Sequence, residues 1–308
     1  MLLETGVFTA EDRSVQWNKV ALIGVGLLGG SIGLALREKR QAGTVVGFVR
    51  RAASIIESEK AGAVDRATRN LRQAIAGADL VIFCTPISRM RGLAEAMVPL
   101  LQRNAVVTDV GSVKGSVVRE VEGMIEQAGA HFVGSHPMAG SEKTGVSAAR
   151  ANLFQDAVCV VTPTARSSKS ALRRVETFWE SLGSTVLRLA PDFHDQLVSR
   201  SSHLPHLIAA VLAHSVLAPD QPAEQRRLCA NGFRDTTRIA SGSPEMWRDI
   251  ALANRKNLSG AIDLFVNRIK SLQKLLKAGD EKGVSKFFEQ AKRRRDQWRK
   301  TQISSSPE

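Results

Sequence analysis

The first half of the chain alternates short apolar runs with stretches in which apolar residues recur at helical spacing. The apolar runs lie at residues 19–23, 44–49, 78–84, 105–110, 131–133, 157–162 and 185–189, and a clear helical stretch lies at residues 170–182. Short apolar strands that alternate with helices are typical of a parallel sheet buried on both faces. The pattern predicts a doubly wound α/β domain over residues 1–189.

The pattern changes after Pro191, where strand-like runs stop and long helical stretches follow. We expect an all-α domain over residues 190–298 and a disordered tail over residues 299–308. In the helical half, apolar residues recur at alternating steps of four and three, at Leu258, Ile262, Phe265, Ile269, Leu272 and Leu276. This seam fits either a plain core or an interface between two helices. We favour a homodimer through the C-terminal helices, because a long helix there needs a second layer to cover it.

A glycine-rich motif joins the first strand to the first helix. Residues 19–23 run into Gly24-Val-Gly-Leu-Leu-Gly29, which has the spacing Gly-x-Gly-x-x-Gly. The first glycine allows a tight turn, the second lets the backbone approach a pyrophosphate, and the third lets helix and strand pack closely. The motif predicts a Rossmann-type dinucleotide site with its phosphates at the helix N-terminus, formed by Gly24, Gly26, Leu27, Leu28 and Gly29.

The end of the second strand bears on which dinucleotide binds. An acidic residue often stands there to hold the ribose hydroxyls. This chain instead has Val49 followed by Arg50 and Arg51. Adjacent arginines can grip a 2′-phosphate, which an acid would repel. We therefore favour NADP as the cofactor and keep NAD as possible; the alternative is that both arginines simply point into water.

His136 is the candidate general base. It follows the apolar run 131–133 and lies in the stretch Gly134–Gly145, whose glycines free the backbone on both sides. A parallel α/β sheet places its chemistry at the carboxyl ends of its strands, and a histidine there can accept a proton near neutral pH. We expect His136 where a strand stops and the backbone turns. A hydrogen-bonded loop histidine without chemistry is the alternative.

Two further strand ends should face the cofactor. They are Thr85-Pro86 after the third apolar run and Gly111-Ser112 after the fourth. Ser112 can donate a hydrogen bond to the nicotinamide or to a nearby histidine. It can also serve as the N-cap of the helix that starts near Lys114, and the two roles are compatible.

Polar residues of the helical half are candidates for binding substrate. His203 and His206 are three apart and can share a helix face, which Pro205 should kink or open. No third metal ligand is obvious, so we expect no metal and interpret the histidines as anion- or substrate-contacting groups. Structural hydrogen bonds are the alternative, for His203 in particular. Arg238 is the candidate carboxylate clamp, and Asp235 could orient it.

Bulk composition narrows the class of protein. The 308 residues are 43% hydrophobic and 24% charged, as in an ordinary globular protein. No apolar run approaches the ~20 residues of a membrane helix, and the N-terminus lacks a signal-peptide core, so we expect no membrane binding and no export. Three widely spaced cysteines fit a cytoplasmic protein. Because tyrosine is absent, dehydrogenases that protonate their substrate with a tyrosine are excluded.

The net charge of +13 favours anionic ligands. The positive charge is densest at residues 292–295 and 299–300, where it looks like the solvated end of a terminal helix. No aromatic-rich strand or zinc-finger spacing accompanies it, so we expect no nucleic-acid binding. A negative substrate and cofactor explain the bias equally well.

Taken in order, the motifs resemble those of prephenate and arogenate dehydrogenases, the enzymes of tyrosine biosynthesis. The similarity covers Lys19 to about Trp298 and is carried by residues 24–33, 109–114, 135–141, 202–206, 233–238 and 246–249. The resemblance implies a prephenate dehydrogenase. Such an enzyme oxidises and decarboxylates prephenate to 4-hydroxyphenylpyruvate and transfers a hydride to NAD(P).

The resemblance also implies a role for each matching residue. His136 corresponds to the catalytic histidine that accepts a hydrogen bond, and then the proton, from the C4 hydroxyl; it must be neutral, so activity should fall at acid pH. Ser112 matches the family serine near that histidine and the nicotinamide. Substrate-binding roles are implied for residues of the helical half, namely His203, His206, Asn231, Arg238 and Trp247.

Two departures from the family pattern matter. The missing acid after the second strand weakens any assumption of NAD. Asn231 lies where the pocket would read the substrate side chain, and its neutral amide gives no ion pair for the ammonium of arogenate, which favours prephenate. An arogenate or dual-specificity cyclohexadienyl dehydrogenase is the alternative. More remote alternatives are another two-domain Rossmann dehydrogenase and a non-catalytic dinucleotide-binding protein.

Overall fold

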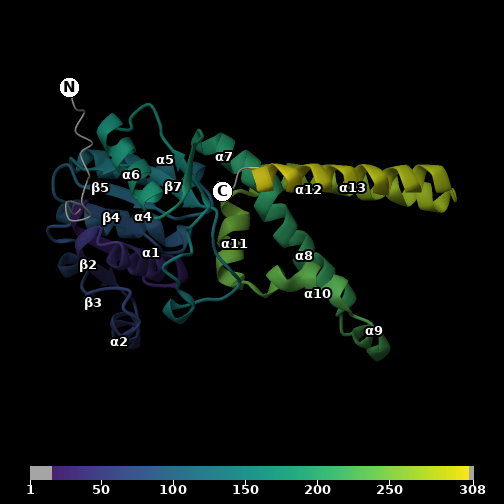
Figure 1. Cartoon of the computed structure of the whole chain (residues 1–308), viewed down its shortest axis with the longest axis horizontal. Helices are drawn as coiled ribbons and strands as arrows, with labels where there is room; N and C mark the ends of the chain where they lie inside the picture. The colour runs from purple at the N-terminus through teal and green to yellow at the C-terminus, as the bar shows by residue number, and fades with distance from the viewer. Residues whose placement is uncertain (1–15, 305–308) are drawn as a thin grey trace, which may run out of the picture. The chain divides into compact units, whose positions relative to one another are not determined.

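The computed structural model describes residues 16–304, and the chain divides into two compact units (Figure 1). Unit 1 contains the residues up to His194 together with Ser241–Ile250. Unit 2 contains Asp195–Ala240 together with the residues from Ala251 onward. The predicted domain boundary at residue 190 stays a prediction. The compact units differ from it in one respect, because Ser241–Ile250, which we placed in the helical domain, belongs to the first unit.

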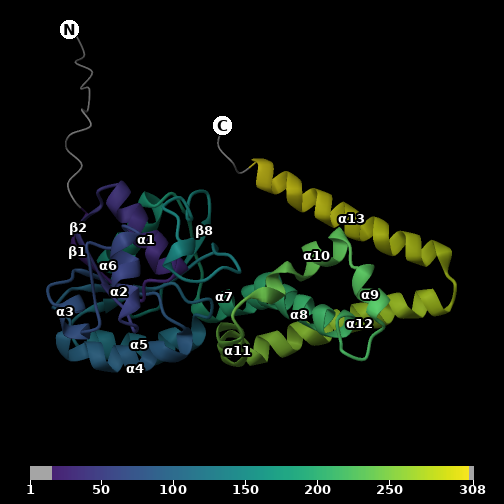
Figure 2. The same cartoon turned by 90° about the horizontal axis from the view of Figure 1, so that it is seen from below.

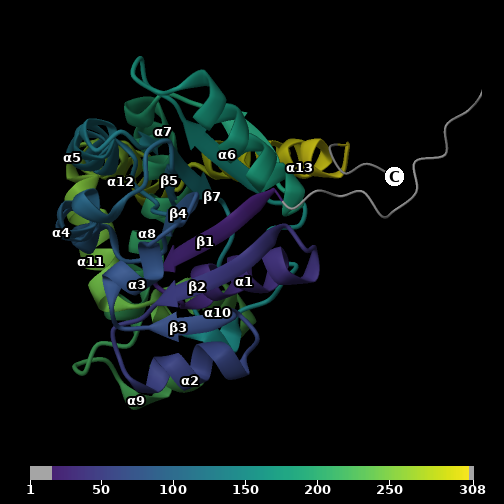
Figure 3. The same ribbon diagram turned by 90° about the vertical axis from the view of Figure 1, so that its left-hand side faces the viewer.

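Unit 1 is built on a six-stranded sheet with the order β3-β2-β1-β4-β5-β6, in which every pair of neighbours is parallel. Figure 3 shows β3, β2, β1 and β4 side by side. The strands are β1 (Trp17–Ile23), β2 (Ala42–Phe48), β3 (Arg66–Thr68), β4 (Leu80–Phe83), β5 (Val106–Asp109) and β6 (His131–Phe132). This is the strand order of the dinucleotide-binding fold, so the predicted Rossmann-type sheet is confirmed.

Helices cover both faces of this sheet, as its sequence pattern requires. Alternate residues of β1 join different cores: Val20 and Leu22 pack with α1 (Leu27–Glu38) and α6 (Lys169–Ser181). Ala21 and Ile23 pack on the other side with three helices. These are α3 (Leu71–Ile75), α4 (Ile87–Met97) and α5 (Gly115–Gln127). A strand buried on both faces needs apolar residues at every position, which explains the unbroken apolar runs.

A second, three-stranded sheet was not predicted. It has the order β7-β8-β9, with β7 (Gly134–Pro137) antiparallel to β8 (Val158–Thr162) and β8 parallel to β9 (Thr185–Arg188). The expectation that residues 157–162 and 185–189 extend the main sheet is therefore wrong. His136 was expected at a turn, but it lies within β7 opposite Val160. Its backbone is thus held by sheet pairing.

Residues 191–304 form helices joined by short connections, which confirms the predicted all-α half. It contains α7 (Pro191–Val198), a π-helical turn η3 (Ser199–His203), α8 (Leu204–Val216), α9 (Ala223–Arg227), α10 (Asn231–Thr237), a 3-10 turn η4 (Arg238–Ser241), α11 (Pro244–Ala253), α12 (Arg255–Lys277) and α13 (Glu281–Ser304). The π-helical turn ends just before Pro205, where the sequence predicted that the helix would open. Within residues 16–304, no helix combines the length and apolarity that crossing a membrane requires.

Helices α12 and α13 are joined by a short turn, and α13 runs back from it (Figure 2). The helix α13 continues to Ser304, so residues 299–304 are helical where we expected a disordered tail. Residues 305–308 lie outside the described part of the chain. Three smaller elements complete the fold, namely α2 (Ala53–Lys60), η1 (Val98–Leu100) and η2 (Val146–Ala148).

Candidate active site

The glycine loop after β1 has the geometry that its spacing predicted. Gly24 has φ +107°, and a Cβ on it would lie 2.7 Å from the carbonyl oxygen of Cys84. A Cβ on Gly29 would lie 2.1 Å from the carbonyl oxygen of Gly24. Around the Cβ position of Gly26 there is open space among the described residues. A phosphate group can therefore approach the backbone at Gly26, where α1 begins with Leu27 and Leu28.

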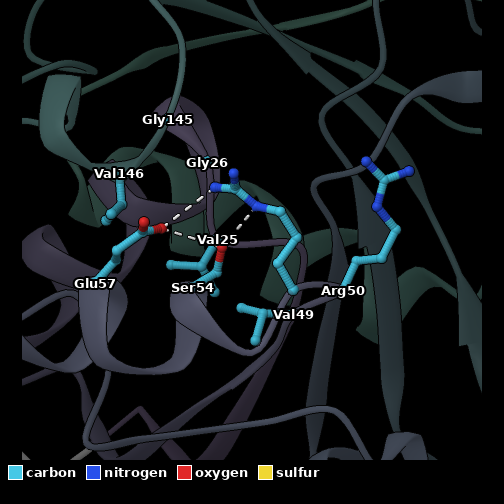
Figure 4. A pocket seen from close by; sticks show the side chains of 9 residues that line it. Val25, Gly26, Val49, Arg50, Ser54, Glu57, Gly145 and Val146 are labelled. Atoms are coloured by element: carbon cyan, nitrogen blue, oxygen red, sulfur yellow. Dashed lines mark hydrogen bonds and ion pairs between the residues drawn. The ribbon is translucent and has the colours of Figure 1, made fainter.

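A pocket adjoins this loop at the end of β2 (Figure 4). Its lining contains Val25, Gly26, Val49, Arg50, Arg51, Ser54, Glu57, Gly145 and Val146. The Arg51 guanidinium donates to Glu57 Oε2 at 3.3 Å and to Ser54 Oγ at 3.3 Å, while the Arg50 side chain points away from Glu57. Sequence reasoning missed Glu57, because it lies in α2 well beyond the position where an acid was sought.

The turn after β4 also meets the glycine loop. A Cβ on Gly24 would lie 3.1 Å from Thr85 Cγ2. The Thr85 hydroxyl is buried and has no hydrogen-bond partner in the part of the chain that the structure describes. Pro86 is the N-cap residue of α4. A buried hydroxyl without a partner beside an open glycine loop fits a bound dinucleotide, which can supply the missing hydrogen bond.

The turn after β5 carries Gly111 and Ser112. The helix α5 begins at Gly115 with Lys114 as its N-cap residue, so Ser112 is not the helix cap that the sequence allowed it to be. The Gly111 amide donates to Asp109 Oδ2 at 2.8 Å, which fixes the turn. Ser112 is half-buried at this fixed turn.

A fully buried ion pair lies beneath that turn. Asp109 and Lys114 are both 0% exposed, and Lys114 Nζ donates to Asp109 Oδ2 and, at 2.7 Å, to the carbonyl oxygen of Ser135. The Ser135 amide donates to Asp109 Oδ1 at 3.1 Å. The ion pair therefore ties the Gly111 turn to the residue that precedes His136.

His136 is 7% exposed and has a buried partner. Its Nδ1 atom lies 2.9 Å from Nε2 of His194, and the two rings meet edge to face at an interplanar angle of 77°. His194 lies in α7 and is 0% exposed. Sequence reasoning missed His194, because no motif marks it. The one available signal was its place four residues before Val198, on the apolar side of a helix.

The segment that follows His136 reaches the nucleotide pocket. A Cβ on Gly30 of α1 would lie 3.0 Å from Val146 Cγ2, and the Arg150 amide donates to Ser31 Oγ at 2.9 Å. Gly145 and Val146 line the pocket beside Gly26. In unit 1, the glycine loop and the strand-end turns thus lie at the carboxyl ends of β1, β4 and β5, and the candidate base follows Ser135, which is bonded to Asp109 at the end of β5.

Trp247 lies in α11, in the segment of this helix that belongs to unit 1. The Ser88 hydroxyl donates to Asp249 Oδ2, and the Arg248 guanidinium donates to Asp249 Oδ1 at 2.7 and 3.0 Å. The Ser88 hydrogen bond lowers the pKa of Asp249, with a further contribution from Arg248. These contacts attach α11 to the start of α4, next to Thr85 and Pro86. Trp247 itself is half-buried.

The two histidines of unit 2 have different surroundings. His203 is 0% exposed, and its Nδ1 lies 3.2 Å from Asn254 Nδ2, which supports the structural alternative that the sequence left open. His206 is 8% exposed, and burial lowers its pKa to about 4. A neutral imidazole carries no positive charge at pH 7, but it can still donate or accept a hydrogen bond.

Asn231 and Arg238 are both exposed. Asn231 is the first residue of α10, and Arg238 follows its last turn. The helix α10 contacts α8, which carries His206. The structure thus brings the helices of these three residues together within unit 2. Their binding roles stay predictions, as does the contact of Asp235 with Arg238. No cluster of potential metal ligands occurs among residues 16–304.

Comparisons with known proteins agree over both halves of the chain. Residues 32–188 match the family model "Prephenate dehydrogenase, nucleotide-binding domain", and residues 190–290 match "Prephenate dehydrogenase, dimerization domain". The prephenate dehydrogenase of Bacillus subtilis is 32% identical over 279 residues, which cover 90% of this chain and 75% of that protein. The cyclohexadienyl dehydrogenase of Zymomonas mobilis is 32% identical over 282 residues, covering 90% and 94%.

A solved structure extends this similarity to the fold. The crystal structure of prephenate dehydrogenase from A. aeolicus in complex with hydroxyphenyl propionate and NAD+ superposes with a TM-score of 0.85. The two chains are 32% identical, and the match covers 91% of this chain and 98% of the other.

Proposed function

Because the chain belongs to the prephenate dehydrogenase family, we propose that it catalyses the oxidative decarboxylation of prephenate to 4-hydroxyphenylpyruvate in tyrosine biosynthesis. The observation that carries the proposal is the buried His136, which β7 holds next to Ser135, the residue that Asp109 and Lys114 tie to the turn after β5. A bound nicotinamide dinucleotide supplies the acceptor for the hydride that leaves C4 of the substrate.

The residues of this chain carry out the proton transfer and orient the reacting groups. His136 accepts the proton of the C4 hydroxyl as the hydride departs, and the ring carboxylate leaves as carbon dioxide while its electron pair enters the ring. The proton returns to the phenolic oxygen, so the overall reaction neither consumes nor releases a proton. Ser112 donates a hydrogen bond near His136 and the nicotinamide. Formation of the aromatic product provides much of the driving force.

We assign substrate binding to residues of the helical elements that follow residue 190. Arg238 presents an exposed guanidinium that can bind a carboxylate bidentately. His206, neutral at pH 7, donates or accepts one hydrogen bond, while Trp247 supplies apolar contact. Asn231 carries no charge that would pair with the ammonium of arogenate, so prephenate is the preferred substrate. Arogenate is the second candidate, favoured by the similarity to a cyclohexadienyl dehydrogenase.

The test is to supply prephenate and arogenate, each with NAD and with NADP, and to follow the absorbance of reduced cofactor. The proposal predicts reduction with prephenate, and the ratio of kcat/KM values ranks the two substrates. Arg238→Gln should mainly raise KM for the substrate, because it removes a binding contact. An enzyme that reduces cofactor with neither substrate would contradict the proposal.

We further propose that NADP is preferred over NAD. The pocket at the end of β2 contains two arginines and a single carboxylate, Glu57, which is already bonded to Arg51 and Ser54. A 2′-phosphate can take the place of that carboxylate on Arg51. Glu57→Gln should therefore raise kcat/KM with NADP relative to NAD, and Arg51→Gln should lower it, each by about two- to fivefold for one exposed ion pair. Unchanged ratios in both variants would show that this pocket does not read the 2′ position.

We also propose a homodimer formed through α12 and α13, in line with the match to a dimerization domain. The predicted seam is buried at Leu258, but Ile269 and Leu276 are 51% and 60% exposed in the single chain. On α13, Phe288 and Trp298 are 59% and 54% exposed. A second copy of the chain would bury this exposed apolar area on the two long helices.

All three cysteines are free, which is consistent with a place in the reducing cytoplasm.

A further inference from the structure

We propose that His194 is a positioning residue for the reaction: it holds the imidazole of His136 through Nδ1, so that Nε2 is the nitrogen that takes up the substrate proton. The inference rests on the proposed function, in which His136 is the base. It concerns a residue that no motif marked and that lies outside the glycine loop and the strand-end turns.

The contact is built from two rigid elements. His136 is fixed in β7, where it pairs with Val160 of β8. His194 lies in the first turns of α7, and its amide donates to the carbonyl oxygen of Ala190 at 2.9 Å. Both rings are buried, and the ring centroids lie 5.1 Å apart. A buried ring nitrogen needs a hydrogen-bond partner, and each histidine supplies the other's.

The chemistry decides the direction of this hydrogen bond. Once His136 has accepted the substrate proton, both of its ring nitrogens carry hydrogen, so Nδ1 must donate. Nε2 of His194 lies 2.9 Å from it and must then accept, which places the hydrogen of His194 on its own Nδ1. Nε2 of His194, which stabilises the imidazolium form of His136, is therefore in hydrogen-bonding position before the reaction begins. A carboxylate plays the corresponding part beside the histidine of serine proteases.

Other ionisable groups lie on the elements around the pair. Below β7, Asp109 and Lys114 neutralise each other as a buried ion pair. On β8, burial raises the pKa of the Cys159 thiol well above its ordinary value, so this group stays neutral. On α7, Asp192 pairs with Arg119 of α5 at the surface. Asp195, the residue that follows His194, is a buried carboxylate.

The test compares three substitutions of His194 with a matched control. His194→Leu removes the acceptor, His194→Gln can still accept a hydrogen bond from Nδ1, and His194→Asn is too short to reach it. His214→Leu makes the same apolar change at an exposed histidine of α8. The measurements are kcat and KM with prephenate across pH, and the tautomer of the His136 ring by nitrogen-15 NMR of the full chain without ligands.

We expect kcat of His194→Leu and His194→Asn to fall about ten- to hundredfold, the usual value of one hydrogen bond to a charged group, while KM changes little. The acid limb of the kcat profile should move to lower pH in both, because the imidazolium loses its acceptor. His194→Gln should restore most of the activity, and His214→Leu should match the wild type. In the wild type, the hydrogen of the His136 ring should reside on Nδ1, and His194→Leu should shift it towards Nε2.

A purely structural role predicts something else. In that case, the folded variants would keep the wild-type acid limb and the wild-type tautomer, and this result would overturn the proposal. If His194→Leu does not fold, the Gln and Asn variants decide: equal acid limbs in these two would also overturn it. The tautomer measurement needs neither prephenate nor nucleotide. A wild-type enzyme that fails to oxidise prephenate would thus refute the proposed function while leaving the role of His194 to be judged separately.

Discussion

Replacing Lys114 by methionine should destabilise the protein far more than removing an ordinary surface charge. The substitution keeps most of the side-chain volume but leaves the Asp109 carboxylate, which is 0% exposed, without its counter-ion. It also removes the hydrogen bond from Nζ to the carbonyl oxygen of Ser135. Two amide donors remain on the carboxylate, from Gly111 and Ser135 at 2.8 and 3.1 Å, and they solvate the charge only in part.

Breaking one partner of a buried ion pair costs about 3–5 kcal/mol in the free energy of unfolding. We therefore expect that loss for Lys114→Met. In the double variant Lys114→Met, Asp109→Asn, no charge is left buried, and the loss should shrink to about 1–2 kcal/mol, which is about 2–3 kcal/mol less than the loss in Lys114→Met alone. Both variants should be folded at low denaturant.

The assay is urea unfolding followed by circular dichroism at one fixed protein concentration, since a dimer's stability depends on concentration. Lys292→Met is the matched control, because Lys292 pairs with Asp296 on the exposed surface of α13. Its unfolding midpoint should not change measurably. The single variant Asp109→Asn is measured in the same way. The reasoning is refuted if Lys114→Met costs less than about 1 kcal/mol, or if the double variant loses the sum of the losses in Lys114→Met and Asp109→Asn.

Three further predictions concern other parts of the fold. Asp249→Ala should lower the free energy of unfolding by about 1–3 kcal/mol in urea titrations, because it removes the acceptor of Ser88 and Arg248; an unchanged midpoint would contradict the role of this contact. The unfolded protein binds a proton at His206 below pH ~6.5, but the folded protein does so only near pH 4, so stability should fall as the pH drops through this interval. His206→Gln should flatten that part of the stability profile, and an identical slope would argue against it. Ile269→Asp should dissociate the proposed dimer, seen by sedimentation, and a dimer that persists would exclude α12 from the interface.

The main sheet could be predicted from the sequence because each of its signals is local. The apolar run of β1 and the glycine spacing from Gly24 to Gly29 depend on neighbours within a few residues. The short strand Arg66–Thr68 was missed, because three residues with a charged first position give no periodic signal. The separate sheet of β7, β8 and β9 was also missed. Nothing in an apolar run indicates which sheet it joins or whether its neighbour is antiparallel.

The candidate site was predictable only where a motif marks it. His136 was found from its glycine-rich surroundings, yet its place inside a strand depends on pairing with Val160, which is distant in sequence. His194 and Glu57 were missed, since each matters through a partner that the fold brings near. Asp249 stood in a recognised motif, but its bond to Ser88 spans 161 positions of the chain. Contacts of this length come from tertiary packing.

The central claim is that His136 is the base for the oxidation of prephenate. The most direct measurement is kcat for the wild type and for His136→Asn, with prephenate and saturating nucleotide near pH 7.5, after confirming that both proteins bind the nucleotide equally. Loss of a general base should reduce kcat by about two to four orders of magnitude. A variant that keeps kcat within about threefold of the wild type would contradict the account.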